Sequence, residues 1–158
     1  MWTENGLLTQ AGDKTFWDRS TLYALRGVYA AGETEKATDY LHRYSATRLL
    51  GDHVPYAIEA WPEGNQCHLS AENGLYGRSV TEGLFGIRPT GFHRFTLTPH
   101  LPQAWDRMTL RDIRAFGTRW DIHLERTSGQ RLRLTIKEDE QVVCQRSLRE
   151  GQTVVIRL

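Results

Sequence analysis

The stretch IRPTGF at residues 87–92 decides the fold, because the spacing of apolar residues changes there. Upstream of it, apolar residues recur every three or four positions, which is typical of one face of a helix. Downstream, they alternate with polar residues, as in strands that have one face in a core. The sequence therefore predicts an α+β chain, with a helical segment at residues 1–90 and an antiparallel β-domain at residues 91–158.

Two helices are expected before a long loop, at about residues 13–31 and 33–50, and a third at about residues 70–86. The connection through Gly32 is so short that the first two helices should be antiparallel neighbours. Four glycines lie within the third helix, where each is unfavourable by about 1 kcal/mol. They predict a smooth side that another backbone can approach, and they are Gly74, Gly77, Gly83 and Gly86.

Six strands separated by turn signals are expected in the second half of the chain. They cover about residues 92–101, 108–116, 119–126, 130–137, 141–148 and 152–158. Alternation is clearest at Trp120, Ile122 and Leu124, which should face a core. Short connections between successive strands favour an antiparallel meander, folded as a small β-sandwich or a curved sheet.

Composition excludes several classes of function. The 158 residues carry a net charge of +1, with 39% hydrophobic and 25% charged residues, so nothing favours nucleic acid or a membrane as a partner. Cys67 and Cys144 form no metal-type pair and predict no disulfide framework. A metal site from His53, His68 and Glu63 has no supporting spacing, so neither a metal nor a cofactor is expected.

The loop at residues 52–69 carries the side chains best suited to catalysis or ligand binding. These are Tyr56, Glu59, Trp61, Glu63, Asn65 and His68. Aromatic faces stack on sugars, amides bind hydroxyl groups, and a carboxylate can activate water. The alternatives are structural: Glu59 solvated or paired with an arginine, the aromatic residues packed in a core, and His68 as a capping or core residue.

Three stretches resemble the final barrel helices of six-hairpin glycoside hydrolases, the α-L-rhamnosidase-like (α/α)6 clan. They are IEAWPEG (58–64), HLSAENGLY (68–76) and TEGLFGI (81–87). The stretch FTLTPHLPQAW (95–105) is similar to the link that leads into the C-terminal β-domain of these enzymes. The resemblance implies the C-terminal portion of a glycoside hydrolase, namely the end of its barrel followed by that β-domain.

The resemblance also implies roles for particular residues. Glu59 matches best the general base of an inverting mechanism, with Glu63 as the reserve candidate. The substrate contacts would be Tyr56, Trp61, Asn65, His68 and Trp17, the last at the opening of the first helix. The general acid of these enzymes lies on earlier barrel helices, so the isolated chain is expected to be inactive.

These implications fix the expected partners. Carbohydrate is the expected ligand, and helices with more than one apolar side should be covered by self-association into a homo-oligomer or by the remainder of a longer chain. Two alternatives stay open: a non-catalytic carbohydrate-binding or structural domain, and a small autonomous enzyme that uses Glu59 and Glu63. A periplasmic or secreted location would follow only if the parent enzyme degrades polysaccharide.

Overall fold

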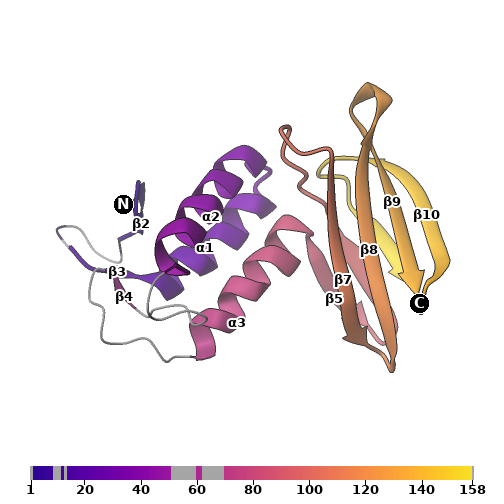
Figure 1. Ribbon diagram of the computed structural model, residues 1–158, viewed down its shortest axis with the longest axis horizontal. Coiled ribbons are helices and arrows are strands. Elements are labelled where there is room, and N and C mark those ends of the chain that lie inside the picture. Colours follow the sequence, from indigo (N-terminus) through magenta and orange to yellow (C-terminus); the bar gives the residue numbers. More distant parts are fainter. Residues whose placement is uncertain (1, 9–11, 13, 51–59, 62–69, 158) are drawn as a thin grey trace. The chain divides into compact units, whose positions relative to one another are not determined.

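The computed structural model describes residues 2–8, 12, 14–50, 60–61 and 70–157 (Figure 1). The chain divides into two compact units, Met1–Leu84 and Phe85–Leu158. Three helices occupy the first unit, and antiparallel sheets make up the second. The predicted α+β class is therefore confirmed. No helix in the described part of the chain is both long and apolar enough to cross a membrane.

The helices of the first unit are α1 (Asp18–Ala30), α2 (Thr34–Arg48) and α3 (Ser70–Arg78), which continues into the π-helical turn η1 (Ser79–Leu84). Helices α1 and α2 are antiparallel neighbours, as predicted, and Gly32 makes the turn between them with a φ of 84°. Leu22, Leu25 and Tyr29 form the buried stripe of α1. The first helix begins later than predicted, because Phe16 and Trp17 are extended.

The four glycines of the third helix do not act alike, so the prediction of one smooth side is partly wrong. A Cβ at Gly83 would lie 2.8 Å from Cδ2 of Tyr29, which confirms close packing at that position. No described atom lies within 4 Å of the corresponding point at Gly74 or Gly77. Gly86 lies beyond the helix, where its φ of 63° and the carbonyl of Thr98 require glycine.

Two short ribbons accompany the helices. Strand β1 (Trp2–Thr3) pairs with β2 (Gly6–Leu7), and β3 (Phe16–Trp17) pairs with β4 (Ala60–Trp61). In the second ribbon Phe16 lies opposite Trp61 and Trp17 lies opposite Ala60. This ribbon leads directly into the first residue of α1.

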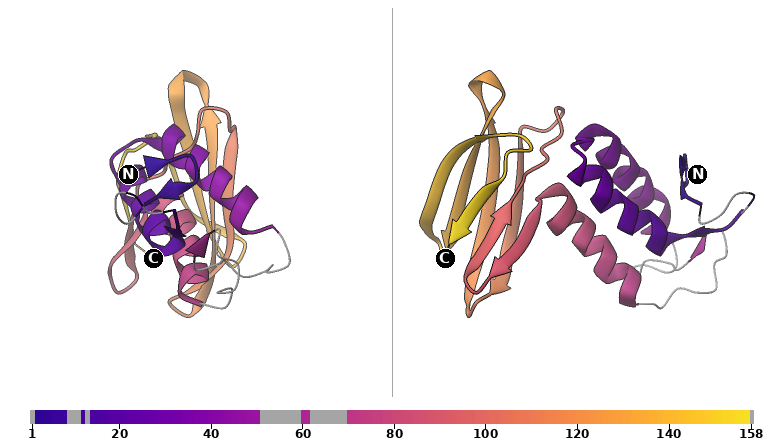
Figure 2. Two further views of the ribbon diagram at one scale, coloured as in Figure 1. Left: turned by 90° about the vertical axis from the view of Figure 1, so that its left-hand side faces the viewer. Right: turned by 180° about the vertical axis from the view of Figure 1, so that it is seen from behind.

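Two antiparallel sheets form the second unit. The larger has the order β10-β9-β8-β7, from strands β7 (Arg107–Ala115), β8 (Thr118–Thr127), β9 (Arg131–Glu138) and β10 (Gln141–Arg149). The smaller has the order β11-β6-β5, from β5 (Ile87–Gly91), β6 (Arg94–Leu97) and β11 (Val154–Arg157). The sheets lie face to face as a small sandwich (Figure 2). Their buried residues include Phe95, Leu97, Trp120, Ile122, Leu124, Leu134 and Ile136.

Two features of the second unit differ from the predictions. The meander ends at β10, because β11 crosses to the other sheet and pairs with β6. Residues 87–91 form the edge strand β5 instead of the end of a helix, and strand β6 is shorter than the predicted strand at 92–101. An edge strand accepts Pro89, whose missing N–H would break the ladder of a central strand.

Candidate functional site

Three helix ends meet at one end of the first unit. Because α1 and α2 are antiparallel, Asp18 at the start of α1 adjoins Arg48 at the end of α2. Helix α3 runs parallel to α1, so its first turn lies at the same end, and Glu72 there binds Arg19. We call Asp18, Arg48 and Glu72 the buried charge cluster.

Asp18 and Arg48 form an ion pair that is almost completely buried. Nε of Arg48 donates to Oδ1 of Asp18 at 3.2 Å, and the two side chains are 0% and 1% exposed. Burial raises the pKa of Asp18 to about 6, although the positive charge of Arg48 opposes the rise. The pKa of this carboxyl therefore lies closer to neutrality than that of an ordinary aspartate.

Arg48 is held by polar and aromatic groups together. Its Nη2 donates to the carbonyl of Asn5 at 2.7 Å, and its Nη1 donates to the hydroxyl of Thr47 at 3.0 Å. The guanidinium carbon lies 4.2 Å from the centre of the Trp61 ring and 5.9 Å from that of Tyr44. Cation–π contacts of this kind gain strength where both groups are removed from water. Arg48 thus connects α2 to the β3–β4 ribbon.

Glu72 is the second buried carboxylate. Its Oε1 accepts a hydrogen bond from Nε of Arg19 at 2.9 Å, and its side chain is 0% exposed. The negative charge of Glu72 also contributes to the raised pKa of Asp18. Oδ2 of Asp18 and Oε2 of Glu72 are buried without a hydrogen-bond partner among the described residues. The cluster can therefore accept further hydrogen bonds from a group outside the described part of the chain.

A structural role explains part of this arrangement. Acidic residues in the first turn of a helix interact favourably with the helix dipole, and both Asp18 and Glu72 occupy such turns. A dipole alone does not require full burial of both carboxylates, because a helix end at the surface gives the same benefit. The burial brings the carboxylates close enough for the charge of Glu72 to raise the pKa of Asp18.

The structure describes two of the residues that the sequence assigned to sugar binding. Trp61 is half-buried on β4, where its ring covers Arg48 and contacts Phe16 at 5.8 Å between ring centres. Trp17 is 38% exposed on β3. Because Trp17 pairs with Ala60, the two tryptophans point to opposite faces of the ribbon. The other candidates, Tyr56, Glu59, Glu63, Asn65 and His68, lie outside the described residues.

Sequence reasoning missed Arg48 as a site residue. The signal was its position, since residues 37, 41, 44 and 48 recur every three or four positions and form the buried stripe of α2. A charged side chain on an apolar stripe must find a charged partner in the core. Asp18 is that partner.

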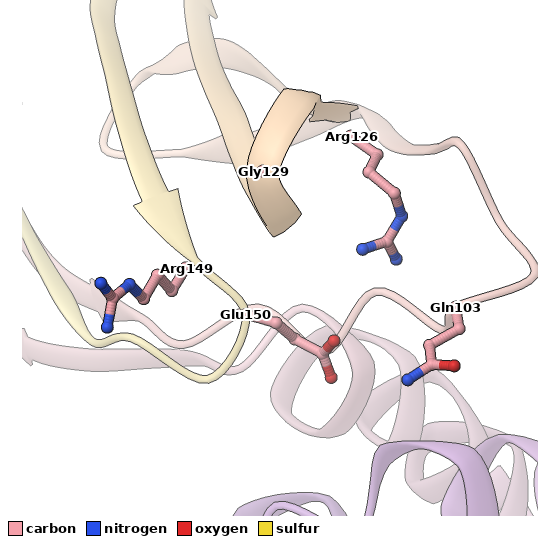
Figure 3. A pocket seen from close by; sticks show the side chains of 5 residues that line it. All are labelled: Gln103, Arg126, Gly129, Arg149 and Glu150. Carbon is pink, nitrogen blue, oxygen red and sulfur yellow. The ribbon is translucent and has the colours of Figure 1, made fainter.

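The second unit contains a polar cavity of about 600 Å³ (Figure 3). It is lined by Gln103, Arg126, Gly129, Arg149 and Glu150. One nitrogen of the Arg126 guanidinium donates to the carbonyls of Leu101 and Pro102, at 3.0 and 2.9 Å. Figure 3 shows the side chain of Arg149 turned away from those of Arg126 and Glu150. Arg126 therefore mainly holds the chain before β7 in place.

Among the described residues, no group of three or more His, Cys, Asp or Glu side chains could hold a metal ion.

Comparison with known proteins gives one structural likeness to report. No protein-family model matches the chain, and no curated protein matches its sequence. A solved structure of a sialidase matches with a TM-score of 0.64 and 16% sequence identity, over 90% of this chain and 15% of the sialidase chain. At this identity the likeness shows a shared fold. The chain thus has a fold that occurs within a carbohydrate-active enzyme, and it spans about 15% of that enzyme's length.

Proposed function

We propose that this chain is part of a glycoside hydrolase, in which it supplies one wall of the sugar-binding site and an accessory β-domain. The observation that carries the proposal is the fold shared with a segment of a sialidase. The resemblance of residues 58–87 to the last barrel helices of six-hairpin glycosidases gives the finer assignment. In that assignment the helices of the first unit belong to the end of an (α/α)6 barrel.

The first unit supports this proposal by anchoring the sequence next to the candidate base. Glu59 is followed directly by Ala60, which is fully buried and pairs with Trp17. The next residue, Trp61, is fixed by the guanidinium of Arg48. A general base must be held in position to within a fraction of an ångström of its productive geometry. In this proposal the buried charge cluster anchors Ala60 and Trp61, the two residues that follow the candidate base Glu59 in the sequence, and Glu63 is the reserve base.

A second candidate function is sugar binding without catalysis. Trp17 favours it, because this tryptophan lies on the β3–β4 ribbon and is 38% exposed, so its ring is available to stack on a ligand. In the resemblance, the general acid lies on earlier barrel helices, and hydrolysis requires both carboxyl groups. We therefore expect the isolated chain to bind sugar and not to turn it over.

Two measurements on the chain separate these functions. Incubation with a panel of aryl glycosides tests turnover, and calorimetric titration with rhamnose and other monosaccharides tests binding. Turnover that is lost in Glu59→Gln would identify an autonomous enzyme. Binding without turnover that is lost in Trp17→Ala, and retained in Trp105→Ala on the second unit, supports the proposed sugar-binding wall. If the chain neither binds nor hydrolyses any of these sugars, the proposal fails.

The proposal includes a partner for the first unit, either a second copy of the chain or the rest of a longer enzyme. Helices of a barrel segment bury their apolar stripes against neighbouring helices, so an isolated segment should associate. Static light scattering over a range of protein concentrations measures this association. A monodisperse monomer at the highest concentration would contradict it.

A further inference from the structure

Two hairpin turns at one end of the second unit hold aromatic residues in a strained backbone. His93, in the turn between β5 and β6, has a φ of 49°, and Phe116, between β7 and β8, has a φ of 59°. Left-handed backbone costs a residue with a side chain about 1–2 kcal/mol; a bulky residue such as Phe116 is an outlier there, whereas histidine adopts it more readily. Glycine would form the turn at Phe116 without this cost, so the strain at Phe116 points to a use of its ring beyond the turn.

The rings of these turns form one cluster, which we call the aromatic tip: Phe92, His93 and Phe116. The rings of His93 and Phe116 stack with centres 5.1 Å apart and planes inclined by 28°. Phe92 meets His93 edge-on at 4.8 Å between centres and meets Phe116 at 6.3 Å. The side chain of Phe92 is 88% exposed, so its ring is presented to solvent.

A cavity of about 480 Å³ lies beside the aromatic tip and shares Phe116 with it. Its polar lining includes Arg114, Thr118, Arg119 and Asp139. The charges around it nearly cancel: Asp112 lies 3.6 Å from Arg114 and 3.9 Å from Arg119, and Glu140 lies 3.9 Å from Arg119. The cavity therefore offers hydrogen-bond donors and acceptors beside aromatic faces, without a strong field of either sign.

We propose that the aromatic tip and this cavity bind a neutral saccharide. A sugar ring would stack its C–H face on the aromatic rings, while Arg119 and Asp139 bind its hydroxyl groups. A nucleic acid would need an excess of positive charge for its phosphates, which this surface lacks. A protein partner, such as a second copy of the chain, would bury the same rings, and light scattering separates that occupant from a saccharide. The site uses residues of the second unit alone, so it stands independently of the proposed function of the first unit.

The backbone strain provides a variant that separates folding from binding. Phe116→Gly removes one ring and also relieves the left-handed backbone, so the variant should unfold at a temperature no lower than that of the original chain. Val142→Ala, at a side chain that is 58% exposed, controls for the loss of exposed apolar surface.

The test is affinity electrophoresis of the full chain in gels that contain soluble glucan, mannan, xylan or arabinogalactan. At least one of these polysaccharides should retard the original chain, and the dissociation constant should rise about tenfold or more in Phe92→Ala and Phe116→Gly. Val142→Ala should bind as the original chain does.

Three results would overturn the proposal. The first is the absence of retardation by any of the four polysaccharides. The second is retardation that Phe92→Ala and Phe116→Gly leave unchanged, including the case in which Trp17→Ala alone abolishes it and places binding in the first unit. The third is self-association, measured by light scattering, that Phe92→Ala abolishes while polysaccharide binding is absent, which would make the aromatic tip a contact between copies.

Discussion

Replacing Asp18 by asparagine should remove a pH dependence that is opposite in sign to ordinary acid denaturation. The folded chain holds the pKa of Asp18 at about 6, against an ordinary value of 3.8. Between these two pH values the folded chain binds a proton that the unfolded chain does not bind. Acidification therefore stabilises the fold through this group, and a rise in pH through the same range destabilises it.

The magnitude follows from the two pKa values. At about 1.4 kcal/mol for each pH unit, the interval from 3.8 to about 6 corresponds to about 3 kcal/mol. About 2 kcal/mol of this should appear between pH values of about 7 and about 4. The free energy of unfolding of the original chain, minus that of Asp18→Asn, should increase by this amount on acidification.

Urea denaturation followed by far-ultraviolet circular dichroism measures this difference, because the α-helices α1, α2 and α3 all lie in the first unit. Taking the difference cancels the carboxyls that are not coupled to Asp18, such as Glu82, whose pKa is lowered by its hydrogen bond to Arg78 and which therefore loses stabilising energy on acidification. A difference that stays constant, or that falls on acidification, would refute the reasoning. A fall would mean that the charge of Arg48 outweighs the burial of Asp18.

Three glycines provide further predictions. Gly86→Ala should destabilise the second unit by more than about 3 kcal/mol, because its Cβ would lie 2.0 Å from the carbonyl oxygen of Thr98 and its φ is 63°. Thermal unfolding followed by the β-sheet signal of circular dichroism measures this loss, and a near-normal melting temperature would contradict it. Gly83→Ala should cost the first unit about 1–3 kcal/mol, because the new Cβ meets the ring of Tyr29 at 2.8 Å. Gly77→Ala, with no described atom within 4 Å, should instead stabilise α3 by about 1 kcal/mol in the same urea titration. Equal effects of Gly83→Ala and Gly77→Ala would show that the contact with Tyr29 is unimportant.

Local patterns in the sequence predicted the elements that depend on local pairing. The alternation of Trp120, Ile122 and Leu124 predicted β8, and the turn signals predicted its hairpin neighbours, because a two-residue period and a tight turn are properties of adjacent residues. The partner of β11 could not be predicted in this way. Val154 pairs with Leu97 of β6 although β10 also lies at a sheet edge, and no local pattern distinguishes these two edges.

The site shows the same limit. Asp18 and Glu72 lie in the first turns of their helices, which is a local property of the sequence. Their complete burial depends on α1, α2 and α3 ending at the same place, and it is this arrangement that raises the pKa of Asp18. Arg48 was identifiable from its place on a buried stripe, but only the fold identifies Asp18 as its partner.

Because β11 crosses to the other sheet, the strands of the second unit can pair only in a certain order during synthesis. Strands β7 to β10 pair only with neighbours in sequence, so they can form as soon as each hairpin leaves the ribosome. Strand β6 must wait, with one edge unpaired, until the entire meander and then β11 have been synthesised. During that interval its edge can pair with another nascent chain. A protein truncated before Val154 would keep this edge open permanently, and aggregation should therefore be its dominant fate.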